Sequence, residues 1–171
     1  MKKRKKRMIP VISIVGRSNT GKTTLIEKLV PEFCRRGYRV ATIKHAAGGF
    51  EIDREGKDSW RHKKAGAYKT ILISPTELAL MEVFEREYSV EELVALYIKD
   101  ADVVLLEGHK NNPYPRIEML RKNVDPLPRD GKEHLWIAVI GDKRHDSGVP
   151  YFQMEEIQKL ADLLEERYLR R

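Results

Sequence analysis

The chain has a single cysteine, Cys34, and no long uninterrupted run of apolar residues. One cysteine cannot form an internal disulfide, so nothing ties the chain to an oxidising compartment. No apolar run approaches the roughly 20 residues that a membrane-spanning helix needs. The basic start, MKKRKKR, is followed by residues that read as a strand and not as the apolar core of a secretory signal. We therefore expect a cytoplasmic protein.

Aromatic residues are scarce, at 8% of the chain, and none interrupts the six basic residues Lys2 to Arg7. Because no aromatic side chains are present in it to stack on bases, this run indicates that residues 1–8 form a flexible, solvated tail. It supplies most of the net charge of +7, so the body of the chain is nearly neutral. We expect neither a nucleic acid nor a membrane as partner, and one domain over residues 9–171.

Buried-strand patterns alternate with amphipathic helical patterns along the body of the chain. A helix with apolar residues at helical spacing is expected over residues 22–36. The strand candidates are MIPVISIV (8–15), YRVATIK (38–44), ADVVLLEG (101–108) and LWIAVIGD (135–142). This alternation predicts an α/β fold with a mainly parallel sheet. Two short candidates, ELALMEVF and RIEML, lack a helix crossover, so we expect them at a sheet edge or in a small appended hairpin.

The stretch GRSNTGKTT, residues 16–24, matches the P-loop (Walker A) pattern between a buried strand and a helix. Its glycines, Gly16 and Gly21, let successive backbone N–H groups converge on an anion. Lys22 can reach the β- and γ-phosphates of a nucleotide, and the positive end of the next helix faces the same point. The predicted nucleotide-binding residues are Gly16, Arg17, Ser18, Asn19, Thr20, Gly21, Lys22, Thr23 and Thr24. With this motif the fold is expected to be a three-layer P-loop NTPase fold, with helices on both faces and short edge strands.

Magnesium in such a site needs a hydroxyl from the loop and a nearby carboxylate. Thr23 supplies the hydroxyl, and Glu107 ends a buried strand where strands of this class open onto the ligand crevice. Asp53, in a long stretch without periodicity, is a second candidate ligand. Glu107 is also our candidate catalytic residue.

Recognition of the base and of a further ligand is less sharply specified. Asp142 follows the last core strand, and its carboxylate could accept hydrogen bonds from N1 and N2 of guanine; an adenine site built from backbone groups stays open. A second anion pocket is a further hypothesis, and its alternative is a set of solvated side chains. The residues of this second anion pocket are Lys44, His45, Arg61 and His62.

Four blocks together resemble the molybdopterin-guanine dinucleotide biosynthesis protein B (MobB) family. They are GRSNTGKTTLIEKL, IKHAAGGFEIDREGKDSWRHKKAGA, LLEGHKNNPYPRIEMLR and IAVIGDK. The resemblance implies a homodimeric GTP-binding adapter that uses GTP and Mg²⁺. It implies as partners a MobA-like guanylyltransferase, which attaches GMP to molybdopterin, and molybdopterin or the molybdenum cofactor. GTP hydrolysis would be at most weak, and the sequence leaves open whether it takes part.

The family's roles carry over to individual positions of this chain. The phosphate-binding role falls on residues 16–24, the acid of the LEG motif on Glu107, and the KH pair on Lys44 and His45. The chain departs from many relatives after this pair, where AAGG replaces further histidines and weakens any metal site there. A small-molecule kinase is the alternative, although no arginine-bearing lid is visible. A nucleic-acid-associated ATPase is another, and its affinity would fall steeply with salt.

Overall fold

The computed structural model describes residues 8–122, 124, 131–142 and 148–170. Their contacts fall into two compact units, where the sequence pattern predicts one domain over residues 9–171. The sheet unit comprises the residues up to His45 and from Ile98 onward, and the hairpin unit is Ala46–Tyr97. The predicted basic tail lies outside the described residues, apart from Met8. Within the described part of the chain, no helix has the length and apolar character needed to span a membrane.

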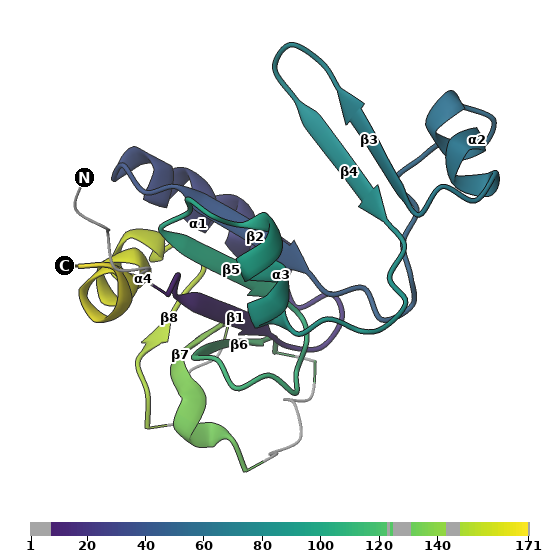
Figure 1. The fold of residues 1–171 in the computed structure, drawn as a ribbon. Coiled ribbons are helices and arrows are strands. Elements are labelled where there is room, and N and C mark those ends of the chain that lie inside the picture. Colours follow the sequence, from purple (N-terminus) through teal and green to yellow (C-terminus); the bar gives the residue numbers. More distant parts are fainter. Residues whose placement is uncertain (1–7, 123, 125–130, 143–147, 171) are drawn as a thin grey trace. The chain divides into compact units, whose positions relative to one another are not determined.

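The sheet unit is built on one parallel β-sheet (Figure 1). Its strands are β1 (Val11–Val15), β2 (Val40–Lys44), β5 (Val103–Glu107), β6 (Arg116–Leu120), β7 (Trp136–Gly141) and β8 (Tyr151–Phe152). Its helical segments are α1 (Lys22–Arg35), a 3-10 turn (Glu133–Leu135), α4 (Ile157–Leu164) and a π-helical turn (Glu165–Leu169). The order across the sheet is β2-β5-β1-β6-β7-β8, and every neighbouring pair is parallel. The predicted α/β fold with a mainly parallel sheet is confirmed.

Strand β1 lies inside the sheet, between β5 and β6. All five of its residues are buried, which is typical of a parallel strand covered on both faces. Strand β6 is also internal, so the prediction of an edge or hairpin position for RIEML is wrong. The edge position was expected because RIEML lacks a helix crossover, yet β6 lies between β1 and β7, with Arg116 and Glu118 only 3% and 1% exposed. The short edge strand of this sheet is β8, with two residues.

Helices α1 and α4 pack on the same side of the sheet and form one apolar core with it. Leu25 and Leu29 of α1 are fully buried, as are Leu160 and Leu164 of α4. The strand residues of this core include Ile12 and Ile14 of β1, Leu105 of β5, Ile117 of β6 and Ile140 of β7. Burial of a leucine or isoleucine side chain contributes about 1.5–3 kcal/mol. This core fixes α1, and therefore the loop before it, against the central strand.

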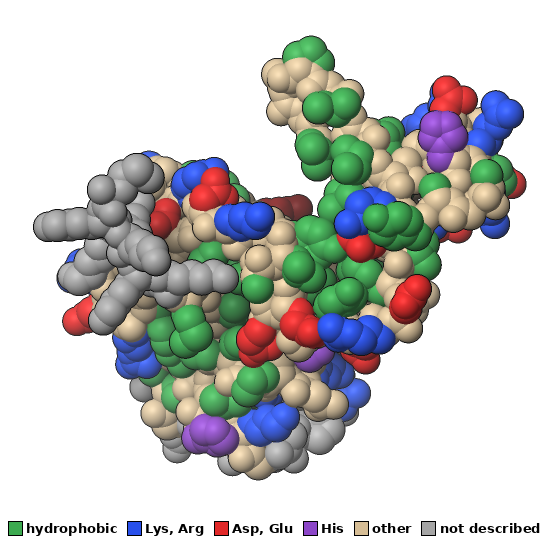
Figure 2. Space-filling view, viewed as in Figure 1, with side chains coloured by type: hydrophobic (Ala, Val, Ile, Leu, Met, Phe, Trp, Pro, Cys, Tyr) green, Lys and Arg blue, Asp and Glu red, His purple; other side chains and the backbone are tan. Residues whose placement is uncertain are grey.

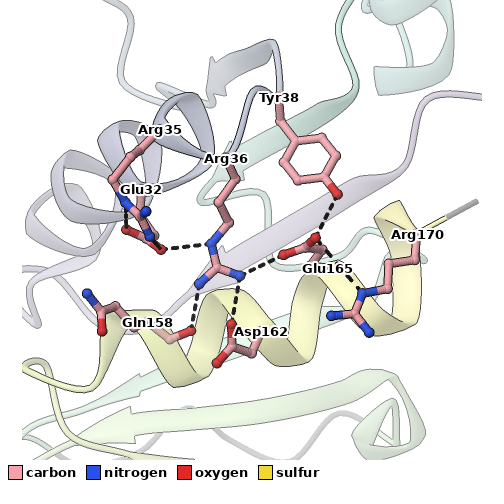
Figure 3. A network of polar contacts seen from close by, with 8 residues as sticks. All are labelled: Glu32, Arg35, Arg36, Tyr38, Gln158, Asp162, Glu165 and Arg170. Atoms are coloured by element: carbon pink, nitrogen blue, oxygen red, sulfur yellow. Dashed lines mark hydrogen bonds and ion pairs between the residues drawn. The ribbon is translucent and has the colours of Figure 1, made fainter.

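The C-terminal end of α1 is tied to the C-terminal helical segment by ion pairs around Arg36 (Figure 3). The Arg36 guanidinium lies 2.7 Å from Glu32, 2.7 Å from Asp162 and 2.6 Å from Glu165. Tyr38 donates its hydroxyl to Glu165 at 3.0 Å. The side chains of Arg36, Glu32 and Glu165 are only 14%, 9% and 20% exposed, so their charges are shielded from much of the solvent. This Arg36 network links two segments that are distant in the sequence.

The hairpin unit contains α2 (Asp58–Lys64), β3 (Lys69–Ile73), β4 (Leu78–Glu82) and α3 (Val90–Tyr97). β3 and β4 pair in antiparallel register, which confirms the appended-hairpin alternative for ELALMEVF. Seven large apolar or aromatic side chains near this hairpin are at least 42% exposed, and Figure 2 shows hydrophobic side chains along it. They are Tyr68, Ile71, Leu72, Ile73, Leu78, Val83 and Phe84. This exposed hairpin surface is unusual, since isolated two-stranded hairpins are only marginally stable in water.

Candidate nucleotide-binding site

The P-loop motif forms the turn between β1 and α1. Gly16 and Gly21 have φ angles of 152° and 96°, and Asn19 has a φ of 61°. A Cβ atom at Gly16 would lie 2.8 Å from Thr20 Oγ1 and 2.9 Å from Met119 Cβ. The loop can therefore adopt this course only with glycine at its first position.

The N-terminal end of α1 is open to an anion. Its N-cap is Gly21, no side chain caps it, and its first turn holds no acidic residue. The Lys22 ammonium folds back over the loop and donates to the carbonyl oxygens of Gly16 at 3.1 Å and Arg17 at 2.7 Å. Uncapped N–H groups, the helix dipole and an ammonium thus point to the same place, as phosphate binding requires.

The hydroxyl of Thr23 donates to Glu107 Oε1 at 3.0 Å. Thr23 belongs to the first turn of α1, and Glu107 is the last residue of β5, directly beside β1. The structure therefore brings together two of the three predicted metal ligands at the carboxyl ends of adjacent strands. A hydroxyl and a carboxylate are oxygen donors of the kind that Mg²⁺ prefers, so this pair fits the ion.

Three lysines surround this carboxylate and the P-loop. Lys44, the residue paired with Glu107 between β2 and β5, has its ammonium 3.8 Å from Glu107 Oε1. Partial burial lowers the pKa of Lys22; Glu107 opposes this shift, and the positive charges of Lys110 and Lys44 add to it. Mutually repelling ammonium groups favour a polyanion, which would relieve the repulsion.

His45 packs its ring edge-on against His109, with ring centroids 4.8 Å apart. His109 has a φ of 54° and follows Gly108 directly after β5. The turn is anchored by Asn112, which is 1% exposed and donates to the hydroxyl of Ser13 on β1 at 2.8 Å. A buried side-chain amide with its partner inside a strand holds this turn in one conformation. His45, directly after β2, is thus part of the sheet unit's carboxyl edge.

Asp142 directly follows β7, and its carboxylate Oδ1 accepts a hydrogen bond from Arg121 Nη1 at 2.8 Å. Arg121 directly follows β6, and its Nε donates to the backbone oxygen of Thr20 in the P-loop at 3.1 Å. Tyr151 donates its hydroxyl to the oxygen of Gly141 at 2.6 Å, one residue before Asp142. Arg121 therefore holds the Asp142 carboxylate, and Tyr151 holds the backbone directly before it.

Asp53, Arg61 and His62 belong to the hairpin unit. Asp53 Oδ1 accepts a hydrogen bond from Ser59 at 3.0 Å, while its buried Oδ2 has no hydrogen-bond partner among the described residues. Arg61 is exposed on α2 and lies 3.9 Å from Asp58. His62 and Asp53 line a cavity of about 510 Å³ in this unit. The predicted metal role of Asp53, and the joining of Arg61 and His62 with Lys44 and His45, stay predictions.

Sequence reasoning missed Arg121 and Lys110. Arg121 follows RIEML. Its place near the P-loop could be inferred only by knowing that this strand lies inside the sheet, beside the strand that leads into the P-loop. Lys110 comes three residues after Glu107, and this spacing is the one signal that could have placed it near the site.

Comparisons with known proteins identify the family. Residues 11–142 match the family model for molybdopterin guanine dinucleotide synthesis protein B. Two relatives are named molybdopterin-guanine dinucleotide biosynthesis adapter protein. The Haemophilus influenzae protein is 36% identical, with 92% of this chain and 88% of that protein covered. The Escherichia coli protein is 34% identical, with 94% of each covered.

Solved structures give the same result. The crystal structure of Bacillus subtilis MobB matches with a TM-score of 0.72 at 29% identity, covering 93% of this chain and 98% of that one. A crystal structure of molybdopterin-guanine biosynthesis protein B matches with a TM-score of 0.67 at 31% identity, covering 91% and 97%. The family-model match spans most of the chain and includes the P-loop, Glu107 and Asp142. The chain belongs to the molybdopterin guanine dinucleotide synthesis protein B family.

Proposed function

We propose that this protein binds GTP with Mg²⁺ at the P-loop and acts as an adapter in the synthesis of molybdopterin guanine dinucleotide. The observation that carries the nucleotide part is the 3.0 Å hydrogen bond between Thr23 and Glu107 beside an uncapped helix N-terminus. A glycine turn without a ligand role would need neither the inward lysine nor a carboxylate at the neighbouring strand end.

Each residue of the site has a part in this proposal. Lys22 and the first N–H groups of α1 bind the β- and γ-phosphates, and Gly16 lets the loop come close to them. Thr23 and Glu107 hold Mg²⁺, with Asp53 as a further candidate. When bound, Mg²⁺ neutralises charge on the phosphate oxygens. Glu107, which contacts Thr23 of the P-loop, would also orient a water in any weak hydrolysis.

Guanine is the proposed base, recognised by Asp142 after β7. A carboxylate accepts hydrogen bonds, and guanine offers two N–H groups on one edge whereas adenine does not. Calorimetric titration of the wild-type protein with GTP and with ATP, both with Mg²⁺, tests this assignment. We expect GTP to bind at least about tenfold more tightly, which corresponds to about 1.4 kcal/mol. Equal affinities would contradict the guanine assignment while leaving the phosphate site intact.

The adapter role rests on the names of the relatives, which are adapter proteins in molybdopterin-guanine dinucleotide biosynthesis. The proposed partners are a MobA-like guanylyltransferase and molybdopterin, and the proposed location is the cytoplasm, where a free cysteine stays reduced. The yield of molybdopterin guanine dinucleotide from a purified transferase, with and without this protein, tests the role. We expect a higher yield with the wild-type protein than with its Lys22→Ala variant. Identical yields with and without the wild-type protein would contradict the adapter role.

The second anion pocket is proposed for the phosphate of molybdopterin. Lys44 and His45 stand at the carboxyl edge of the sheet unit, and Arg61 and His62 are exposed side chains of the hairpin unit. The double variant His45→Ala/Arg61→Ala should lower the yield of the reconstituted reaction while GTP affinity changes less than about threefold. Full yield from this variant would contradict the pocket.

A homodimer is proposed through the exposed hairpin surface. Ile73 of β3 is 80% exposed and Leu78 of β4 is 64% exposed, in a family expected to be dimeric. A symmetric partner would cover these side chains and the open edges of the hairpin. Sedimentation at tens of micromolar should show a dimer for the wild type and a shift toward monomer for Ile73→Asp. Thr76→Asp, which places the same charge in the hairpin turn, is the control; a monomeric wild type would contradict the dimer.

A further inference from the structure

Arg121 connects the two ends of the proposed nucleotide site. Its Nε donates to the carbonyl oxygen of Thr20 in the P-loop at 3.1 Å, and its Nη1 donates to Asp142 Oδ1 at 2.8 Å. A Cβ atom on Gly21 would lie 3.0 Å from Arg121 Nη2, so the third nitrogen packs against the P-loop backbone. One guanidinium thus touches the phosphate loop and the candidate base-recognition residue at once.

The sheet topology explains this contact. β1, β6 and β7 are consecutive neighbours, and all three run parallel. Leu120 of β6 is in register with Gly141 of β7, so Arg121 and Asp142 each come one residue after a matched pair. The P-loop, Arg121 and Asp142 therefore leave the sheet side by side at its carboxyl edge.

We propose that Arg121 is a positioning residue for selection of the base: anchored on the P-loop carbonyl of Thr20, it fixes the Asp142 carboxylate toward the base. This inference rests on the proposed function, because it assumes that a nucleoside triphosphate occupies the P-loop and that Asp142 contacts its base. It assigns a role to a residue that lies outside the P-loop motif.

The hydrogen-bond capacity of the carboxylate permits this arrangement. An ionised carboxylate has about four acceptor positions on its two oxygens. Arg121 uses one position on Oδ1, so Asp142 keeps enough acceptors for two N–H groups of guanine. The planar guanidinium also fixes the plane of the acid, since its N–H groups point in fixed directions. A lysine at this position would keep the charge and lose that orientation.

The Arg121–Asp142 pair is only partly buried. The side chains of Arg121 and Asp142 are 38% and 42% exposed, so water weakens their direct attraction. Their effect is therefore expected on the geometry of ligand binding and not mainly on folding stability. The bond from Arg121 to the buried Thr20, which is 1% exposed, anchors the arginine to a fixed part of the loop.

The experiment measures binding of GTP, ATP and inorganic tripolyphosphate, each with Mg²⁺, by calorimetry. In the Arg121→Met variant we expect GTP affinity to fall about tenfold, and the affinities for ATP and tripolyphosphate to change less than about threefold. Arg39→Met is the control, because Arg39 forms an exposed ion pair with Asp100 at 2.6 Å in the same unit. It should leave all three affinities unchanged.

Two results would overturn the inference. An equal loss for all three ligands would make Arg121 a phosphate-binding cation, and unchanged GTP affinity would make the Arg121–Asp142 pair a surface ion pair. Wild-type protein that binds tripolyphosphate but does not prefer GTP over ATP would instead refute the guanine part of the proposed function, and the inference with it. If Arg121→Met does not fold, Arg121→Lys tests the same point, and we expect it to keep tripolyphosphate binding and lose part of the GTP preference.

A double-mutant cycle with Asp142 distinguishes a positioning role of Arg121 from general damage to the site. Asp142→Asn should reduce the preference for GTP over ATP, because the amide has one acceptor oxygen where the carboxylate has two. If Arg121 acts through Asp142, adding Arg121→Met to Asp142→Asn should lower that preference no further. Additive losses in the double variant would contradict the inference.

Discussion

Thr23 Oγ1 and Glu107 Oε1 lie 3.0 Å apart, although 84 positions separate the two residues in the sequence. The contact exists because β1, which leads into the P-loop, and β5, which ends at Glu107, are parallel neighbours in the sheet. It places a hydroxyl and a carboxylate beside Lys22, the arrangement that a magnesium-bound triphosphate needs.

Replacing Glu107 by Gln should weaken GTP binding in the presence of Mg²⁺ about 10- to 100-fold, because a charged ligand to the ion is lost while the shape is kept. Binding in the presence of EDTA should change little. Calorimetry under both conditions measures the difference. Glu27→Gln, on the exposed side of α1, is the control. Equal losses with and without Mg²⁺ would mean that Glu107 only orders the turn after β5.

Replacing Gly16 by Ala should disrupt the P-loop. The added methyl would lie within 2.9 Å of Thr20 Oγ1 and of Met119, at a φ of 152° that side chains rarely adopt. We expect a lower melting temperature and loss of GTP binding together, with strain of roughly 1–3 kcal/mol. Gly48→Ala, where nothing lies within 4 Å, is the control. Wild-type GTP affinity in Gly16→Ala would show that the loop has another conformation.

The Arg36 network should stabilise the sheet unit (Figure 3). Arg36→Met removes the one partner that Glu32, Asp162 and Glu165 share and leaves their charges close together. We expect its melting temperature to fall by several degrees. Arg39→Met, which breaks only an exposed pair, should lower it by much less. Equal effects of the two variants would show that the network contributes no more than a surface ion pair.

Glu32 makes stability depend on acid pH. Hydrogen bonds from Arg35 and Arg36 lower the pKa of Glu32 from 4.5 to about 2. Because the folded-state pKa is depressed, this carboxylate stabilises the fold above about pH 4.5, and the contribution is lost as pH falls toward 2. Glu32→Gln should therefore be less stable than wild type at pH 7, and the gap should close by about pH 2. Urea unfolding at several pH values measures it; a gap that is constant with pH would contradict the assignment.

The P-loop and Glu107 could be predicted because their signals are local. A glycine-rich turn that carries Lys and Thr between a buried strand and a helix is typical of phosphate binding, and an acid at the end of VVLLE lies where parallel strands open. The place of RIEML could not be predicted, because strand order depends on how the chain crosses between strands. Charged residues such as Arg116 and Glu118 are also usually exposed, and here they are buried. Arg121 was missed for the same reason. The hairpin unit was not separated because no linker composition marks residues 46 or 97.

The measurement that tests the central claim most directly is calorimetric titration of GTP with Mg²⁺ into the Lys22→Ala variant. Lys28→Ala serves as the matched control, since Lys28 is an exposed lysine of the same helix. We predict that Lys22→Ala lowers the affinity about 100-fold or more, with an unchanged melting temperature in the absence of nucleotide, because it removes the ammonium over the loop. Lys28→Ala should bind like the wild type. Equal GTP affinity in the two variants would contradict the claim that this P-loop binds a nucleoside triphosphate.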